Sequence, residues 1–209
     1  MSAAYRVPSG RHRVEEVIQR SRFITTLGRA RNVEEAREFV RTVKEEFPDA
    51  NHNCWAYVAG PPGDTASVGM SDEGEPHGTA GRPMLTVLLH AEVGEIVAVV
   101  TRYFGGVKLG KGGLVRAYSS GVQLALASAP VVLKVERVRV RIRVAYPSGD
   151  AVRRVLEGEG IVVISESYGA EVQFEVAVPS EDLDALERQV ASITRGAGRV
   201  EPFKMEAGE

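Results

Sequence analysis

Residues 137–144 read RVRVRIRV, and this stretch decides the fold of the second half of the chain. Valine and isoleucine alternate strictly with arginine, which is the two-residue period of a strand with one buried and one exposed face. We therefore expect helices to cover one face of the sheet that contains this strand, and the arginine face to stay open.

The segments after this strand continue a regular pattern of helices and strands. A helix pattern over residues 147–156 is stopped by glycines, and two alternating strands follow at 161–168 and 172–178. Ser180 is expected to cap a second helix, and a last strand is expected at 199–203. The order β-α-β-β-α-β predicts a ferredoxin-like domain over residues 134–209.

The first half, residues 1–133, is less regular and predicts an α/β domain with a mixed sheet. Asn32 can cap a helix that carries an apolar stripe and ends before Pro48. Further helices are expected at 83–90 and 113–128, and strands at 14–18, 23–27, 54–59 and 95–104. We therefore expect a two-domain protein of the α+β class.

Composition and charge exclude several classes of protein. The 209 residues carry a net charge of −2 and one cysteine, so there is no disulfide framework and no globally basic nucleic-acid-binding character. The longest apolar run is far too short to span a bilayer. We expect a cytoplasmic protein without a membrane partner; the sequence does not define an oligomeric state.

Residues 101–121 read TRYFGGVKLGKGGLVRAYSSG and form a glycine-rich connection between an apolar strand and a helix. Gly105–Lys111 fits most of a P-loop, but Gly112 stands where the magnesium-binding Ser or Thr is needed, which excludes that class. The free backbone N–H groups could still bind an anion, or the glycines could only permit tight packing. The candidate binding residues are Arg102, Tyr103, Gly105, Gly106, Lys108, Gly110, Lys111, Gly112, Gly113, Arg116 and Tyr118.

An acidic loop precedes this segment: residues 71–84 read SDEGEPHGTAGRPM. Asp72, Glu73 and Glu75 could bind a divalent metal or act as acid and base, or could form an ordinary solvated turn. Although His52, Cys54 and His77 add possible zinc ligands, no paired Cys or His spacing supports a zinc site. We predict no catalytic residue, no metal and no cofactor.

The arginine strand allows two interpretations. Arg137, Arg139, Arg141 and Arg143 could form a ladder of phosphate contacts, which makes them a secondary candidate surface. The alternative is cross-strand pairing with the glutamates of the third and fourth strands of the domain. No aromatic pair stands among the arginines to stack bases, so charge pairing is favoured.

Several long motifs together resemble the YigZ/IMPACT family. They are SRFI at 21–24, HNCWAY at 52–57, SDEGEPHGTAGRPML at 71–85 and VVTRYFGGVKLGKGGLVRAYSSG at 99–121. The resemblance implies a first domain with the fold of the second domain of a small-subunit ribosomal protein, and a second domain similar to domains of elongation factor G. Eukaryotic relatives control a stress kinase through an extra N-terminal domain, which we expect this chain to lack.

The family resemblance implies a link to translation and no established enzymatic activity. We therefore predict a non-enzymatic regulatory protein that binds RNA, the ribosome or a translation-associated protein through the Gly-rich segment. The alternative is an enzyme or a small-ligand module for a nucleotide or phosphorylated metabolite, in which the acidic loop and the Gly-rich segment share one cleft. A third possibility is a protein-interaction module in which the glycines serve only packing.

Overall fold

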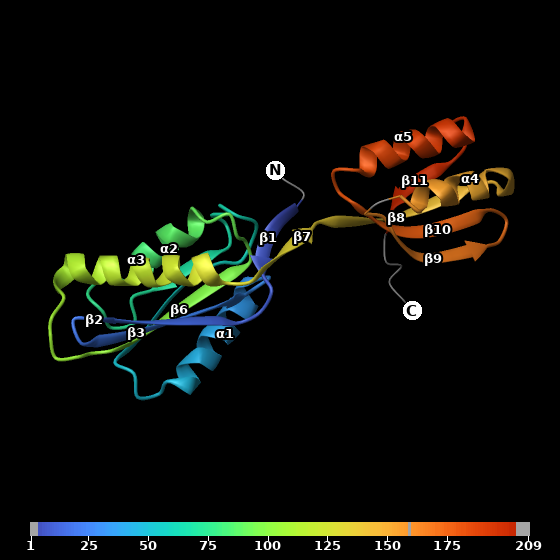
Figure 1. Cartoon of the computed structure of the whole chain (residues 1–209). Coiled ribbons are helices and arrows are strands. Elements are labelled where there is room, and N and C mark those ends of the chain that lie inside the picture. The colour runs from blue at the N-terminus through green and yellow to red at the C-terminus, as the bar shows by residue number, and fades with distance from the viewer. Residues whose placement is uncertain (1–3, 159, 204–209) are drawn as a thin grey trace. The chain divides into compact units, whose positions relative to one another are not determined.

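The computed structural model describes residues 4–158 and 160–203, which form two compact units (Figure 1). One unit is Tyr5–Lys134, and the other takes in the chain from Val135 onward together with Ala4, whereas we expected the division one residue earlier, after residue 133. The outermost parts of the two predicted domains, 1–3 and 204–209, lie outside the described residues. Helices and strands are mixed in both units, which confirms the α+β class.

The first unit contains both strands and helices. In chain order they are β1 (Ala4–Pro8), β2 (His12–Ile18), β3 (Ser21–Arg29), α1 (Val33–Glu46), β4 (His52–Val58), β5 (Val68–Ser71), α2 (Gly81–Leu89), β6 (Ile96–Tyr103), α3 (Gly110–Ser128) and β7 (Val131–Val135). As predicted, Asn32 caps α1: its Oδ1 accepts a hydrogen bond from the Glu35 backbone N–H at 2.8 Å. β1, β5 and β7 were not predicted, and β1 and β7 pair as a separate two-stranded sheet.

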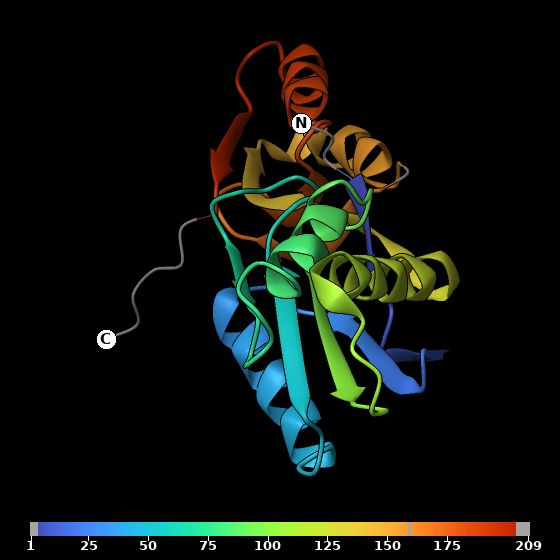
Figure 2. The ribbon, with the colours of Figure 1, turned by 90° about the vertical axis from the view of Figure 1, so that its left-hand side faces the viewer.

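The main sheet of this unit has the strand order β2-β3-β6-β4-β5. All of its pairings are antiparallel, so the predicted mixed sheet was wrong. β3 and β4 do run in the same direction, as their connection through α1 predicts, but β6 inserts between them and pairs with both. Figure 2 shows β4 in cyan beside β6 in yellow-green at the centre of this unit.

Helices cover both faces of this sheet. α1 lies on one face, and α2 and α3 lie on the other (Figure 1). Because both faces of the central strand β6 are covered, seven of its eight residues, Ile96 to Arg102, are buried, which accounts for the unbroken apolar run in the sequence. The polar end of this strand, at Arg102 and Tyr103, leads directly into the Gly-rich segment.

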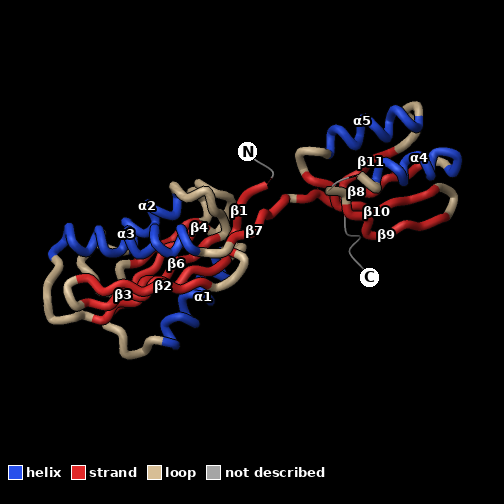
Figure 3. Tube along the Cα trace, in the orientation of Figure 1, coloured by secondary structure: helices blue, strands red, loops and turns tan. Residues whose placement is uncertain are grey.

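The second unit has the ferredoxin-like topology that its sequence predicts. Its elements are β8 (Arg137–Val144), α4 (Tyr146–Leu156), β9 (Val162–Tyr168), β10 (Val172–Pro179), α5 (Leu183–Thr194) and β11 (Arg199–Pro202). The strand order is β11-β8-β10-β9, and both helices lie on one side of this sheet (Figure 3). Ser180 does not cap α5: its Oγ donates to the Glu136 carbonyl oxygen at 3.1 Å, and the helix begins after Asp182.

Among the described residues, none of the helices combines the length and the apolar character that a bilayer crossing demands.

Candidate functional site

The acidic loop and the end of β6 meet through a buried ion pair. Arg102 Nη1 donates to Glu75 Oε1 at 2.6 Å, and only 6% and 3% of the two side chains are exposed. The same Glu75 oxygen accepts a hydrogen bond from the Tyr118 hydroxyl of α3 at 2.8 Å. Three segments that are far apart in the chain are therefore joined at one carboxylate.

Tyr118 links this carboxylate to the core below it. Its side chain is fully buried, and burial raises the pKa of its phenol, so the hydroxyl remains a hydrogen-bond donor at neutral pH. The Cys54 Sγ lies 2.8 Å from the Asp72 carbonyl oxygen and 3.4 Å from the Tyr118 oxygen, and its single S–H can donate to either one. Burial raises the pKa of Cys54 to about 12, so this thiol is a packing group and not a nucleophile.

Asp72 holds the start of α2. Its carboxylate accepts hydrogen bonds from the backbone N–H groups of Gly78, Ala80 and Gly81 at 2.8, 3.0 and 2.9 Å. Burial alone would raise the pKa of Asp72, but these hydrogen bonds outweigh it and hold the pKa below its usual value. Its position at the helix N-terminus also suits a negative charge. Both carboxylate oxygens of Asp72 are therefore engaged in stabilising the N-terminus of α2.

The other acidic residues do not form a metal site. Glu73 Oε1 pairs with Lys44 Nζ of α1 at 2.5 Å, and His77 is fully exposed, with its ring Nδ1 3.6 Å from Asp72 Oδ2. No group of three or more His, Cys, Asp or Glu side chains within the described parts of the chain could hold a metal ion. Because Asp72 and Glu75 are already engaged, the loop offers no free carboxylate pair for acid–base chemistry.

Arg102 and Tyr118 were predicted to form part of a binding surface, but both side chains are buried. The Arg102 guanidinium lies 5.4 Å from the ring centres of both Phe23 and Phe104, and its Nη2 donates to Ser21 Oγ at 3.4 Å. Its Nε–H has no acceptor among the described residues. A side chain buried and paired in this way positions its neighbours and offers a macromolecule little surface.

The glycines of the turn have different tasks. We define the Gly-rich turn as residues 104–113, which connect β6 to the first turn of α3. A Cβ at Gly105 would lie 1.9 Å from the Arg20 backbone oxygen, so only glycine fits against the β2–β3 turn. Gly106 and Gly110 have φ values of +85° and +70°, which glycine adopts without strain. Gly112 has open space around it, and nothing in its packing requires a glycine.

The predicted cations of this segment are exposed. Lys108 lies in the turn, and Lys111 and Arg116 lie in the first turns of α3. None of the three pairs with an acidic residue of the described chain, whereas the cations of β2 and β3 at Arg13, Arg22 and Arg29 are all ion-paired. Tyr103 was also predicted as a contact, but its hydroxyl donates to Asp49 Oδ1 at 2.8 Å, beside the turn.

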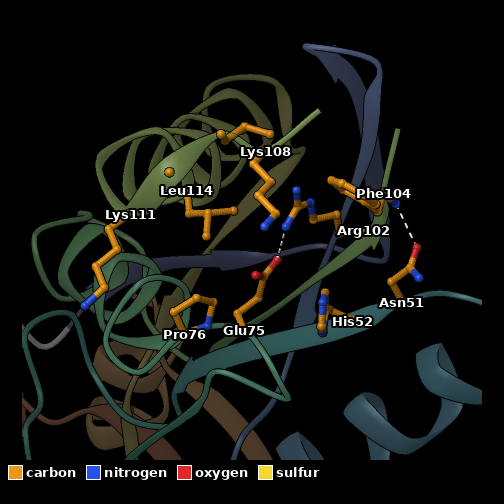
Figure 4. Close-up of a pocket in the computed structure, with 11 residues that line it drawn as sticks. Asn51, His52, Glu75, Pro76, Arg102, Phe104, Lys108, Lys111 and Leu114 are labelled. Carbon is orange, nitrogen blue, oxygen red and sulfur yellow. Dashed lines mark hydrogen bonds and ion pairs between the residues drawn. The ribbon is translucent and has the colours of Figure 1, made fainter. Parts of the chain in front are cut away.

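A pocket of about 410 Å³ opens between the Gly-rich turn and the ends of β4 and β6 (Figure 4). Its lining residues come from β4, the acidic loop, β6, the turn and α3. They are Asn51, His52, Glu75, Pro76, Arg102, Phe104, Lys108, Leu109, Gly110, Lys111 and Leu114. We did not predict Asn51, Pro76, Phe104, Leu109 or Leu114, because no local pattern marks a residue that lines a pocket.

In the second unit the arginine strand follows the charge-pairing interpretation at two positions. Arg141 Nη2 lies 3.3 Å from Glu175 Oε1 of β10, and Arg143 Nη2 lies 3.9 Å from Glu201 Oε2 of β11. These pairs connect β8 to its two neighbours across the open face of the sheet, as expected for cross-strand opposite charges.

The other two arginines of this strand make different contacts. The Arg139 guanidinium lies 4.7 Å from the centre of the Phe203 ring, a cation–π contact that we did not anticipate. Arg137 Nε donates to the Gly160 carbonyl oxygen at 3.2 Å. The arginine face is therefore largely engaged with its own domain.

Comparisons with known proteins identify relatives over nearly the whole chain. A family model described as the Impact N-terminal domain matches residues 19–126, and one described as a domain of unknown function matches residues 142–197. The chain is 40% identical to an IMPACT family member of Haemophilus influenzae over 99% of this chain and 100% of that protein. It is 41% identical to IMPACT family member YigZ of Escherichia coli, over 91% and 94% of the two chains.

A solved structure described as a hypothetical protein supports the fold along the whole chain. It matches with a TM-score of 0.70 and 38% sequence identity, and the match covers 99% of this chain and 100% of that one.

Proposed function

This chain belongs to the IMPACT family, and we propose that it is a non-enzymatic, translation-linked regulatory protein that binds ribosomal RNA through its Gly-rich turn. The exposed cations of that turn and of the α3 residues directly after it carry the proposal. Lys108, Lys111 and Arg116 lack acidic partners in the described chain, so their charge is available to phosphates. Family membership itself supports only likeness to other IMPACT family members.

The local character of this charge fits a protein whose net charge is −2. A globally acidic protein that binds RNA must concentrate positive charge at one place. Phe104 is 46% exposed at the same place, where its ring could stack on a base.

Sedimentation with ribosomes and isolated subunits tests this function. Three phosphate contacts predict a fall in affinity of about 20- to 40-fold as salt rises from about 50 to 200 mM. We expect Lys108→Ala/Lys111→Ala/Arg116→Ala to abolish the salt-sensitive binding. The matched control is Arg37→Ala/Arg154→Ala/Arg188→Ala, which removes the same charge from the exposed faces of α1, α4 and α5.

Two results would contradict the proposal. One is the absence of co-sedimentation of the wild-type protein at low salt. The other is equal loss of binding in the turn variant and in the control, because that would reflect net charge and not a defined surface.

A further inference from the structure

The pocket beside the Gly-rich turn has the size of a small-ligand site. Its volume of about 410 Å³ lies within the range of roughly 300–1000 Å³ that such sites occupy. Its walls combine apolar groups with a few polar ones, which is the usual composition of a pocket that orients a ligand. Neither the family models nor the relatives assign a ligand to it.

One end of the pocket suits an anion. The Lys108 ammonium group points into the pocket beside the Arg102 guanidinium (Figure 4). Glu75 is the one carboxylate among the lining residues and is already paired, so Lys108 adds an uncompensated positive charge. Arg102 itself is buried and keeps one N–H without an acceptor in the described chain.

The start of α3 adds backbone donors at this end. The helix begins at Gly110, and no side chain of the described residues accepts a hydrogen bond from its first N–H groups. Such a terminus favours a phosphate, and here it borders a cavity lined by three cationic side chains, Arg102, Lys108 and Lys111. Phosphate is therefore the anion that this geometry fits.

The adjacent wall, beyond Arg102, suits a planar ring with polar edges. Phe104 is held in place by its backbone N–H, which donates to Asn51 Oδ1 at 2.7 Å, and its ring stays partly exposed. This bond uses the Asn51 oxygen and leaves its NH₂ group as a donor. His52 Nδ1 lies 3.0 Å from the Glu73 carbonyl oxygen, so Nδ1 carries the proton and Nε2 of the neutral ring is an acceptor.

We propose that this pocket binds one nucleotide unit, with its phosphate at Lys108 and the start of α3 and its base against Phe104. A donor, an acceptor and an aromatic face next to a phosphate site are the groups that recognise an unstacked nucleotide. An RNA end and a free nucleotide present the same chemistry. The assignment to an RNA end rests on the proposed function, whereas the assignment of the pocket to a nucleotide does not.

The test is equilibrium binding of four kinds of probe to the full chain. The probes are nucleoside monophosphates, the corresponding nucleosides, inorganic phosphate, and short single-stranded RNA with or without a terminal phosphate. We expect monophosphates to bind more tightly than either nucleosides or phosphate. Phe104→Ala should weaken this binding by about 5- to 150-fold, and Lys108→Ala by about 10- to 150-fold.

Val107→Ala is the matched control, because Val107 is exposed in the same turn and does not line the pocket. We expect it to leave binding unchanged. Phe104 and Lys108 are exposed as well, so these variants should fold like the wild type, which the fluorescence of Trp55 can verify.

The outcomes distinguish an RNA end from a free nucleotide as the ligand, and they distinguish failure of the nucleotide pocket from failure of ribosome binding. Competition between a monophosphate and RNA that carries a terminal phosphate would support an RNA end as the ligand. Binding of free nucleotides alone would support the pocket and assign it to a metabolite. Absence of nucleotide binding, or equal binding by the Phe104, Lys108 and Val107 variants, would overturn the nucleotide pocket even if ribosome binding persisted.

Discussion

Removal of the Arg102 charge should destabilise the first unit strongly. In Arg102→Met, the Glu75 carboxylate would stay buried and lose its cation, keeping only the Tyr118 hydroxyl as a partner. Breaking a buried pair by removing one member typically costs about 3–5 kcal/mol. With a guanidinium dependence of about 4 kcal/mol per M, the unfolding midpoint should fall by about 1 M.

The chain offers a selective probe for this measurement. Trp55 is the single tryptophan of the protein and lies in the unit Tyr5–Lys134, so its fluorescence reports that unit alone. It stacks on Tyr57 with a ring distance of 5.8 Å, and this environment is lost on unfolding. Denaturant titration followed at Trp55 therefore measures the stability of the unit that holds the ion pair.

A matched surface pair isolates the effect of burial. Arg22 Nε lies 2.6 Å from Glu15 Oε1, the same separation as in the buried pair, but the two side chains are 48% and 45% exposed. We expect Arg22→Met to shift the midpoint little or not at all, because solvent screens an exposed pair. Equal shifts in Arg102→Met and Arg22→Met would refute the reasoning.

A substitution at Glu75 should change stability in opposite directions in the wild type and in Arg102→Met. Glu75→Gln should destabilise the wild type, because it leaves Arg102 buried without a counter-charge. The same substitution should stabilise Arg102→Met, because it removes the unpaired carboxylate and still offers Tyr118 an acceptor. A destabilising effect in both backgrounds would show that the charge is not the cause.

Three further predictions concern the same unit. Gly105→Ala should lower the unfolding midpoint measured at Trp55, because its Cβ would meet the Arg20 backbone. Gly112→Ala lies in open space on α3 and should raise the free energy of unfolding by about 0.5–1 kcal/mol. A lower midpoint for Gly112→Ala than for Gly105→Ala would contradict the packing role of Gly105. Burial tends to raise the pKa of Glu95, but its cationic partners Lys134 and Arg29 hold that pKa below its usual value. The ionised carboxylate therefore stabilises the fold, and the free energy of unfolding should decrease as pH falls below about 5. Glu95→Gln should make this decrease smaller in denaturant titrations between about pH 6 and 3. Cys54 should react with a thiol reagent only as fast as the unit opens, and rapid labelling of the native protein would contradict its burial.

The sequence predicted the elements whose signals are local. The alternation of β8 and the Asn32 cap of α1 depend on neighbours in the chain, and both are confirmed. β5 has four residues and β1 has five, and neither was predicted, whereas the equally short β11 was expected because two glycines precede it. The order of the first sheet depends on where β6 inserts, which is a matter of tertiary packing and not of any single segment.

The site was predicted in its parts but not in its assembly. The sequence identified the acidic loop and the Gly-rich segment as candidates and indicated no metal spacing. It placed Glu75 and Arg102 on the surface, because charged side chains are seldom buried unless paired, and their pairing across 27 positions has no local signal. Asn51 and Phe104 meet because β4 and β6 are antiparallel neighbours, which chain order alone did not establish.

The buried ion pair is better explained by placement than by stability. A well-packed apolar pair is often as stable as a buried salt bridge, so stability alone gives no reason for Glu75 and Arg102 to be charged. Arg102 lies two residues before Phe104, and Glu75 fixes the loop that forms the facing wall of the pocket. We therefore expect Arg102→Met/Glu75→Gln to keep a cooperative Trp55 transition and to lose most of its nucleotide affinity. Unchanged affinity in a folded double variant would show that the pair has no part in positioning the pocket.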